Sequence, residues 1–345
     1  MNTEEKFNYI TRNLTEIVGE NKLRYLLETR DIKVYWGTSP TKCPSIAYML
    51  PMNKIGDLLK ANCEVIIFFA DIHASLDNLK STFEEVNKRT IFYEFLIKEI
   101  LGSMNIPFLE KLKFVKGSDI QLSKEYMIDI YKLSSITNIN QAKHSGSEVV
   151  KQDKNPKLSS LLYPLLQALD EEYLGVDMEI GGIDQRKIFM YADEYLPKLG
   201  YDKRIHLMTP LIPGLTKTGK MSSSEPESKI DFYDNDTEII RKIKNAFSVD
   251  GKIEGNCIIS LLKYLVFPRL EEGGFIIDRD EKYGGSVNFE TYDELEKHFI
   301  EGKICSVDIK PALAREIIKI ISPIRTQVMK NIDLLKNAYP DLIIF

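Results

Sequence analysis

The sequence has few cysteines and no long apolar run, and each shortage excludes a class of protein. Its four cysteines, Cys43, Cys63, Cys257 and Cys305, are widely scattered and form no CxxC pair. This spacing argues against a zinc site and a disulfide framework, and it suits a reducing compartment, so we expect the cytoplasm. No apolar run is long enough to span a bilayer, and the polar first residues do not resemble a secretory signal.

An excess of positive charge is also missing. The formal net charge is -5 over 345 residues, whereas proteins that bind nucleic acids are often strongly basic. Local basic patches on an acidic body can still hold a structured RNA, so the net charge does not decide the partner. The apolar fraction of 43% and the charged fraction of 28% are those of a globular protein, and the length favours two domains.

Short apolar segments alternate with helical patterns over the first two thirds of the chain. Residues 65–70 (VIIFFA) are apolar at every position, as a parallel strand covered on both faces requires. Further strands are expected at residues 32–37, 112–115, 176–180 and 205–211. Helices are expected over the first thirty residues and over 45–61. This alternation predicts an α/β fold with a doubly wound parallel sheet of the Rossmann type. Helical patterns dominate later, so we predict one domain over residues 1–232 and a mainly α-helical domain over 233–345.

The strongest local motif is the run KMSSS that begins at Lys220 and follows the segment PGLTKTG. Glycine, serine and threonine make this segment flexible. Lys217 and Lys220 supply mobile positive charge, and the hydroxyls of Ser222 and Ser223 can donate to phosphate oxygens. Such a loop suits a reaction in which negative charge moves onto a departing pyrophosphate. The alternative is a solvated loop of serine and lysine.

A second motif lies on the helix predicted over residues 161–170. Tyr163, Gln167 and Asp170 stand at i, i+4 and i+7 and therefore line one face. If they are buried they need hydrogen-bond partners, which a small polar ligand can supply. The alternative is that Gln167 and Asp170 face water. Pro164 warns that the helix starts or kinks there.

A third motif, GGIDQ, follows the strand predicted at residues 176–180. Gly181 and Gly182 let the backbone approach a ligand at the edge where α/β sheets bind ligands. Asp184 can accept hydrogen bonds from ribose hydroxyls, and Gln185 can donate and accept. Taken alone, this motif is common in ordinary loops.

Together these motifs resemble the tyrosyl-tRNA synthetases of the archaeal and eukaryotic cytoplasmic type, which are class I synthetases. The resemblance runs from about Leu23 to the end of the chain. It is carried by further stretches as well, namely YWGT at 35, FADIHASLDN at 69, GSDIQLSKEY at 117, VVKQ at 149, EKYGG at 281, VDIK at 307 and SPIR at 322. The KMSSS run indicates class I, and the helix motif together with Tyr35 indicates tyrosine.

The resemblance implies a role for each motif residue. Tyr35 and Asp170 would bind the phenol oxygen of tyrosine, and a phenylalanine would leave both unpaired. Tyr163, Gln167 and Gln185 would hold the α-ammonium group. Gly37, Gly182 and Asp184 would contact the AMP part of ATP. Lys220 would contact its phosphates. The chemistry needs positioning and charge stabilisation rather than a protein nucleophile.

The resemblance also implies the partners. The reaction would activate tyrosine with ATP, with Mg²⁺ accompanying the phosphates, and would transfer tyrosine to tRNA(Tyr). In the C-terminal domain Tyr283 would stack on the first anticodon base and Asp308 would bind its edge, as single-stranded bases are usually read. An insertion at about residues 110–155 would form a homodimer interface.

One motif departs from the family pattern. The HIGH-like motif should lie over residues 44–48, where relatives usually begin it with histidine, but this chain has Ser45 and ends the motif with Tyr48. Ser45 can donate to a phosphate, can cap the helix that begins there, or both. We expect Ser45 and Tyr48 at the ATP site. His73 reaches either the ligand site or a partner within the fold.

Two alternatives to an active tyrosine enzyme stay open at this stage. One is a weakened tRNA-binding paralogue in which Ser45 is the lesion, although the chain retains Lys220 and every pocket position. The other is the tryptophanyl enzyme, which the pair of Tyr35 and Asp170 disfavours because an indole only donates.

Overall fold

The computed structural model describes residues 1–76, 81–104, 106–149, 157–217, 219, 221–222, 225–270 and 273–342. The chain forms two compact units. Unit 1 comprises Met1–Thr41, Lys54–Glu94 and Ile106–Leu211, and unit 2 comprises Lys42–Asn53, Phe95–Asn105 and Ile212–Phe345. No helix in the described ranges is long and apolar enough to cross a membrane.

A six-stranded sheet of order β1-β6-β5-β2-β3-β4 forms the centre of unit 1. Its strands are β1 (Glu16–Val18), β2 (Lys33–Thr38), β3 (Glu64–Phe69), β4 (Leu112–Lys116), β5 (Met178–Gly182) and β6 (Ile205–Thr209). Strands β2 to β6 pair in parallel. The predicted doubly wound sheet is therefore confirmed. The short β1, which pairs antiparallel with β6, was not predicted, because a segment of three residues is too short to show the apolar pattern of a strand.

Helices surround this sheet, and two of them have residues in both units. Those within unit 1 are α1 (Thr3–Thr11), α2 (Glu20–Thr29), α4 (Asp71–Leu76), α6 (Gly117–Gln121), α7 (Lys124–Ile136), α8 (Ile139–Ser145), α9 (Leu158–Tyr173) and α10 (Arg186–Tyr195). The helices divided between the units are α3 (Met49–Lys60) and α5 (Phe83–Gly102). Residues 45–61, expected as one helix, form a short 3-10 turn at Ile46–Tyr48 followed by α3.

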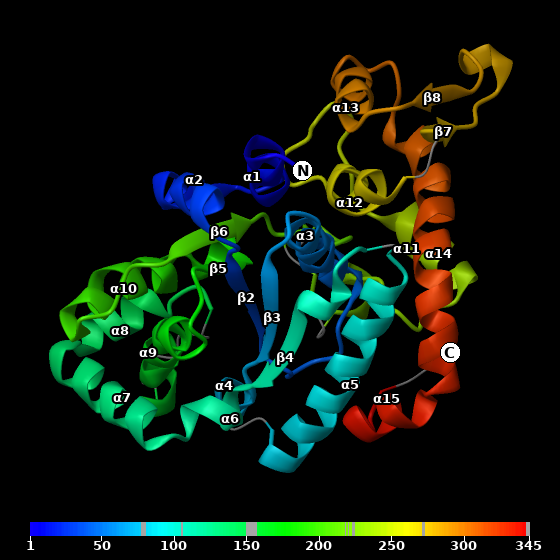
Figure 1. Cartoon of the computed structure of the whole chain (residues 1–345). Helices are drawn as coiled ribbons and strands as arrows, with labels where there is room; N and C mark the ends of the chain where they lie inside the picture. The colour runs from blue at the N-terminus through cyan, green and yellow to red at the C-terminus, as the bar shows by residue number, and fades with distance from the viewer. Residues whose placement is uncertain are drawn as a thin grey trace. The chain divides into compact units, whose positions relative to one another are not determined.

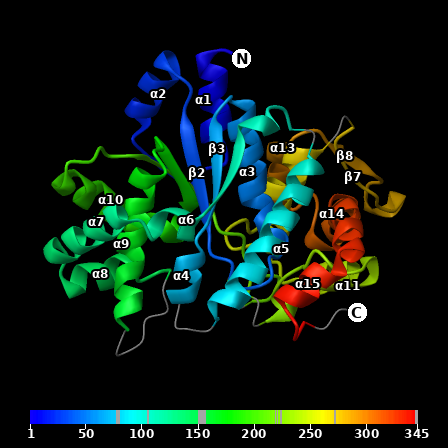
Figure 2. The ribbon, with the colours of Figure 1, turned by 60° about the horizontal axis from the view of Figure 1, so that its bottom comes forward.

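Helix α9 is the element that matters most for the site. It packs against α7, α8 and α10, which are grouped on one side of the sheet in both ribbon views (Figures 1 and 2). The helix runs from Leu158 to Tyr173 through Pro164, so it does not start at the proline.

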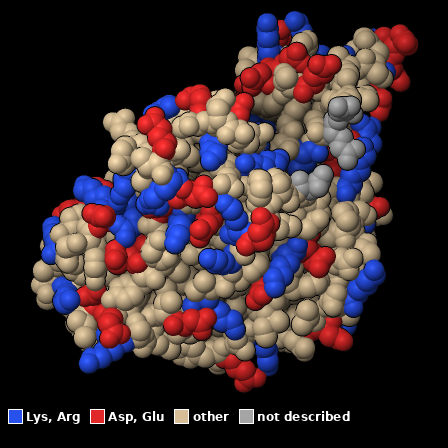
Figure 3. Space-filling model, viewed as in Figure 1, with Lys and Arg blue, Asp and Glu red and all other residues tan. Residues whose placement is uncertain are grey.

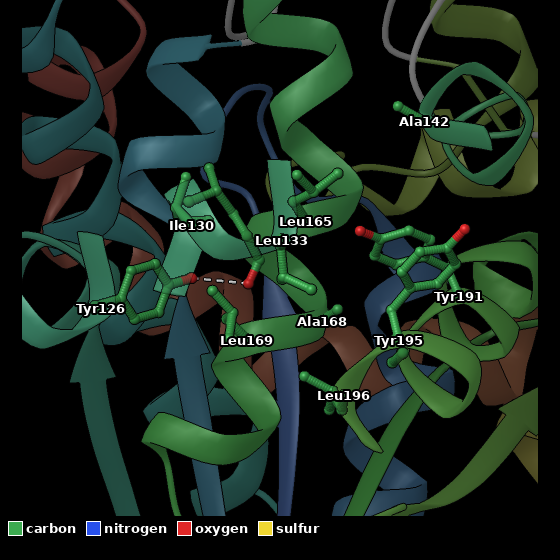
Figure 4. Close-up of a cluster of buried hydrophobic side chains, with 12 residues drawn as sticks. Tyr126, Ile130, Leu133, Ala142, Leu165, Ala168, Leu169, Tyr191, Tyr195 and Leu196 are labelled. Atoms are coloured by element: carbon green, nitrogen blue, oxygen red, sulfur yellow. Dashed lines mark hydrogen bonds between the residues drawn. The ribbon is translucent and has the colours of Figure 1, made fainter. Parts of the chain in front are cut away.

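An apolar core holds α9 in place. Leu165 and Leu169 of α9 are almost fully buried against Tyr126 and Leu133 of α7 (Figure 4). The Tyr126 hydroxyl lies 2.8 Å from the carbonyl oxygen of Leu166. Each fully buried leucine contributes roughly 1.5–3 kcal/mol. One stripe of α9 thus belongs to this core, which leaves another stripe for the polar motif.

Unit 2 is mainly helical, as the sequence predicted for the C-terminal region. Its helices are α11 (Asp236–Asn245), α12 (Cys257–Leu261), α13 (Tyr292–Ile300), α14 (Ser306–Lys330) and α15 (Ile332–Ala338). A two-stranded sheet of β7 (Phe275–Ile277) and β8 (Val287–Phe289) is added to them. The functional division at about residue 232 stays a prediction.

Candidate functional site

Asp170 on α9 is the most deeply placed residue of the polar motif. It is 1% exposed, so the alternative that it faces water is wrong. Its Oδ1 accepts hydrogen bonds from Gln121 Nε2 and Tyr126 Oη, both at 2.8 Å. Burial raises the pKa of Asp170 well above its ordinary value, and these two donors oppose that shift. Both donors engage Oδ1, so Oδ2 is left without a donor among the described residues.

Tyr35 on β2 supplies a second buried polar group of the kind predicted. The residue is 1% exposed, and its ring packs edge-on against Phe68 with centroids 6.0 Å apart. Its hydroxyl has no hydrogen-bond partner within the described ranges. Burial, and then the charges of Glu179 and Asp170, raise the pKa of Tyr35 well above its usual value. The phenol therefore stays protonated and is able to donate and to accept.

His73 on α4 belongs to the same region. Its Nδ1 lies 3.4 Å from Gln121 Nε2, and its ring meets that of Tyr163 edge-on at 4.6 Å. Burial lowers the pKa of His73 to about 4, so the ring is neutral. In the described part of the chain, His73 Nε2 and Gln121 Oε1 are buried without partners.

Gln121 donates to Asp170 and also contacts His73, and the charge of Asp170 acts on the Tyr35 phenol. An unpaired buried polar group costs about 1–3 kcal/mol, so such a concentration indicates a place where a ligand completes the hydrogen bonds. A small molecule with a hydroxyl group that both donates and accepts fits this set.

Gln167, one turn before Asp170, is held by a carboxyl group. Its Nε2 donates to Glu179 Oε1 on β5 at 2.8 Å. Because the two polar atoms of an amide point apart, Gln167 Oε1 is turned away from Glu179. Tyr163, Gln167 and Asp170 thus lie on one helix, as predicted, and Gln167 presents an acceptor.

The glycine motif lies at the carboxyl ends of the strands, which all meet at one edge of a parallel sheet. A Cβ at Gly182 would lie 2.5 Å from Asp184 Oδ1, and a Cβ at Gly181 would lie 2.9 Å from Gln185 Cγ. Only glycine lets the backbone pass so close to Asp184 and Gln185. Gly37, near the end of β2, is on the adjacent strand. The sheet therefore brings these motif residues to one edge.

The KMSSS run belongs to unit 2, and the structure describes it only in part. Lys220, Ser223 and Ser224 lie outside the described residues. The backbone N–H of Ser222 donates to Ser228 Oγ at 2.9 Å. Ser228 is fully buried, so the middle of the run is anchored at Ser222.

Ser45 lies beside this run. Its Oγ is 4.0 Å from Met221 Sδ, and its backbone bridges to Asp231. Ser45 occupies the N-cap position of the 3-10 turn that contains Tyr48, but its side chain makes no capping hydrogen bond. The capping alternative is therefore wrong, because the backbone N–H of Tyr48 donates to the backbone carbonyl oxygen of Ser45 and not to its side chain. The role of Ser45 toward phosphate stays a prediction.

The two residues predicted to contact the anticodon differ in their exposure and in the hydrogen bonds that they already make. Tyr283 is 64% exposed, and the Lys282 ammonium lies 4.9 Å from its ring centroid. Asp308 is partly buried, and its Oδ2 accepts from the backbone N–H of Cys305 at 3.0 Å, at the start of α14. Tyr283 is thus available to a partner, whereas Asp308 already serves as a cap with one oxygen.

Several residues of the site were missed by sequence reasoning. Gln121 and Tyr126 hold Asp170, and Glu179 holds Gln167. Gln121 and Tyr126 lie in the stretch GSDIQLSKEY, which was singled out without a role. A glutamate in the middle of an otherwise apolar strand segment, MEIGG, was the signal for Glu179.

The chain matches the family described as class I tRNA synthetases (W and Y) over residues 27–322. It is 52% identical over 322 residues to the cytoplasmic tyrosine–tRNA ligase of Gallus gallus. It is 46% identical over 339 residues to the probable cytoplasmic tyrosine–tRNA ligase of Encephalitozoon cuniculi. The crystal structure of tyrosyl-tRNA synthetase complexed with L-tyrosine from Archaeoglobus fulgidus superposes with a TM-score of 0.88 at 38% identity.

The matches differ in how much of each relative they cover. The aligned part is 93% of this chain but 60% of the Gallus gallus protein. It is 98% of this chain and 100% of the Encephalitozoon cuniculi protein, and 95% of this chain and 100% of the Archaeoglobus fulgidus chain. The chain thus spans about three fifths of the vertebrate relative and the whole of the shorter ones.

Proposed function

Because the chain belongs to the class I tRNA synthetases of the tryptophan and tyrosine group, we propose that it is a tyrosine–tRNA ligase. It activates tyrosine with ATP and then transfers the tyrosine to the terminal adenosine of tRNA(Tyr). The observation that carries the choice of tyrosine is the buried pair of Tyr35 and Asp170. A phenol can accept from one and donate to the other, whereas an indole only donates.

The described contacts give each residue of the amino-acid site a task. Asp170 accepts from the substrate phenol through Oδ2, and Tyr35 completes the bonds of the same oxygen. Gln167 offers its carbonyl oxygen to the α-ammonium group, together with Tyr163 and Gln185. Phenylalanine would leave Tyr35 and Asp170 unpaired, which is the physical basis for rejecting it.

The chemistry follows from positioning. The tyrosine carboxylate attacks the α-phosphorus of ATP, so that tyrosyl-adenylate forms and pyrophosphate leaves. Gly37, Gly182 and Asp184 hold the AMP part, while Ser45, Tyr48 and Lys220 meet the phosphates with help from Ser222 and Ser223. The positive charge of Lys220 stabilises the charge that develops on pyrophosphate. Mg²⁺ is proposed to arrive with the phosphates of ATP.

The aminoacylation assay tests this proposal directly. The full-length protein is incubated with ATP, labelled tyrosine and tRNA(Tyr), and acid-precipitable label is counted. We expect tyrosine to be attached and tryptophan not to be. Attachment of tryptophan alone would redirect the proposal to the other branch of the family. The relatives are named as cytoplasmic proteins, and we propose the same compartment here.

An exposed apolar surface supports the proposed homodimer. Around α7 and the start of α9, four large apolar side chains are at least three fifths exposed, namely Leu122 at 65%, Tyr131 at 67%, Ile139 at 64% and Leu158 at 79%. Large apolar side chains left exposed are often covered in protein–protein contacts. Three of the four lie in the segment 110–155, and residues 150–156 lie outside the described residues.

Replacing Tyr131 by glutamate is expected to dissociate the proposed dimer, because a charge buried within an apolar contact is left desolvated and unpaired. We expect the dimer dissociation constant to rise at least about tenfold. Sedimentation equilibrium measures it. Tyr25→Glu is the matched control, since Tyr25 is 65% exposed on α2. Equal effects of both variants, or none from Tyr131→Glu, would contradict this interface.

Recognition of tRNA has to rely on local features. Basic and acidic side chains are interspersed over the face shown in Figure 3, in agreement with the net charge of -5. An exposed aromatic ring such as that of Tyr283 offers base stacking, which does not require a large basic surface.

Replacing Tyr283 by alanine is expected to slow the charging of tRNA(Tyr) about tenfold, since stacking contributes roughly 1–3 kcal/mol per base. Tyrosine activation without tRNA should not change. Initial charging rates are measured with tRNA(Tyr) and with a tRNA altered at the first anticodon position. The same loss on both tRNAs would refute stacking on that base.

A further inference from the structure

Three titratable side chains are buried together next to the amino-acid site, and no role has been given to two of them. Glu171, Glu179 and His206 each offer a ligand-type atom within 4.8 Å of the others. They are at most 2% exposed. Tyr35 pairs with Glu179 across β2 and β5, and Glu179 pairs with His206 across β5 and β6. Paired residues project to the same face of a sheet, so Tyr35, Glu179 and His206 form a row on one face. Glu171 and Gln167 of α9 contact this row at His206 and Glu179.

Two carboxyl oxygens of this cluster have no hydrogen-bond partner among the described residues. Glu171 Oε1 lies 2.8 Å from His206 Nε2, and Glu179 Oε1 accepts from Gln167. The other oxygen of each glutamate is buried and has no partner in the described ranges. Two carboxylates can only accept, so two such oxygens in one buried cluster repel each other unless a proton lies between them.

We propose that Glu171 and Glu179 share one proton through their Oε2 atoms, and that this proton makes Glu179 a positioning residue for the amino-acid site. With the proton on the Oε2 side, Glu179 Oε1 remains a pure acceptor. Gln167 must then present its amide N–H to Glu179 and its carbonyl oxygen to the substrate ammonium group. The role rests on the proposed function, because that function gives Gln167 its ligand.

A bound divalent cation is the competing explanation, since two carboxylates and an imidazole are a common donor set. The geometry favours the proton. Two ligands at 2.0–2.1 Å from one tetrahedral zinc ion lie roughly 3.3 Å apart, whereas Glu171 Oε1 and His206 Nε2 are only 2.8 Å apart. That spacing is a hydrogen bond, and His206 stacks on Phe189 with centroids 4.7 Å apart.

The charges around the pair set the pH at which the proton leaves. Burial raises the pKa of Glu171 to about 8 and that of Glu179 well above its ordinary value. Burial lowers the pKa of His206, so its ring is neutral in this range. The other ionisable groups that act on the pair come from several elements, namely Lys22, Tyr35, Asp170, Asp193 and Arg204.

The direction of the pH effect follows from the raised pKa. A carboxyl group whose folded pKa lies above its unfolded value contributes most to stability at low pH, and it loses that contribution as pH rises toward the folded value. The shared proton is therefore bound at low pH and is lost as the pH rises toward the raised pKa values of the two glutamates. Once the proton is lost, the two carboxylates repel each other. Glu179 Oε1 then moves away from Gln167 Nε2, the hydrogen bond that orients Gln167 is weakened, and KM for tyrosine rises.

The test compares Glu179→Ala with Glu179→Gln in the full-length protein. Glutamine reproduces the protonated glutamate, because its oxygen accepts from Gln167 and its amide N–H donates to Glu171. Tyrosine-dependent exchange of pyrophosphate into ATP is measured from pH 6.5 to 9.5. We expect Glu179→Ala to raise KM for tyrosine at least tenfold with little change in KM for ATP. We expect Glu179→Gln to recover most of that affinity and to lose the rise in KM that the wild type shows at alkaline pH.

Several outcomes would overturn the shared proton. One is an alkaline rise in KM in Glu179→Gln equal to that of the wild type. Another is an equal loss in Glu172→Gln, the matched control, whose side chain pairs with Arg204 instead. A third is stoichiometric zinc in the purified protein by elemental analysis. If Glu179→Ala fails to fold, the pH profile of Glu179→Gln still decides. Absence of exchange in the wild type would reject the proposed function itself.

Discussion

Replacing Asp170 by alanine is expected to remove most of the preference for tyrosine over phenylalanine. The substitution deletes the buried acceptor of the substrate phenol, and a buried polar group that loses its partner costs about 1–3 kcal/mol. We therefore expect the ratio of kcat/KM for tyrosine to that for phenylalanine to fall on the order of 100-fold. Pyrophosphate exchange with each amino acid measures the ratio.

The control has to separate selectivity from stability, because Asp170→Ala also leaves the donors of Gln121 and Tyr126 without their acceptor. Asp129 is matched, since it is buried on α7 and accepts from Tyr173 Oη at 2.9 Å and from Lys132 Nζ at 2.7 Å. Asp129→Ala should lower the melting temperature without changing selectivity. Unchanged selectivity in Asp170→Ala would remove Asp170 from the substrate site.

Replacing Lys220 by alanine is expected to lower kcat for tyrosine activation by about 100- to 1,000-fold. Removing one preorganised group that stabilises developing charge has effects of this size. KM for tyrosine should stay nearly constant, because the residues proposed to bind tyrosine lie in unit 1 and do not include Lys220. Steady-state pyrophosphate exchange with varied tyrosine gives both parameters.

Lys217 offers a comparison within the same segment. It is exposed, and its ammonium lies 5.7 Å from the ring centroid of Phe247. Lys217→Ala is expected to lower kcat less than tenfold. If the two variants lose activity equally, the charge of the segment as a whole matters and Lys220 has no special position.

The sequence predicted the sheet because its signal was local. The strand VIIFFA and its parallel neighbours can be predicted from their apolar composition, and the structure confirms them. The helix with Tyr163, Gln167 and Asp170 was also predictable, since the spacing i, i+4, i+7 places all three on one stripe. The membership of the family is confirmed by the match over residues 27–322.

The partners of these residues could not be predicted, because they depend on strand order and register. Glu179 lies beside Tyr35 only since β5 pairs with β2, although the two residues are far apart in sequence. Gln121 reaches Asp170 from a helix after β4. Ser45 was given two possible roles, as a helix cap and as a phosphate donor, and its backbone bridge to the distant Asp231 could not be predicted from the sequence. The roles of the site residues stay predictions until the variants are measured.

Exchange of labelled pyrophosphate into ATP, run with each of the twenty amino acids, tests the central claim most directly. It requires neither tRNA nor any assumption about individual residues. A tyrosine ligase should give strong exchange with tyrosine and only trace exchange with phenylalanine and tryptophan. Exchange with no amino acid, or exchange that is fastest with another one, would contradict the proposal that this chain activates tyrosine.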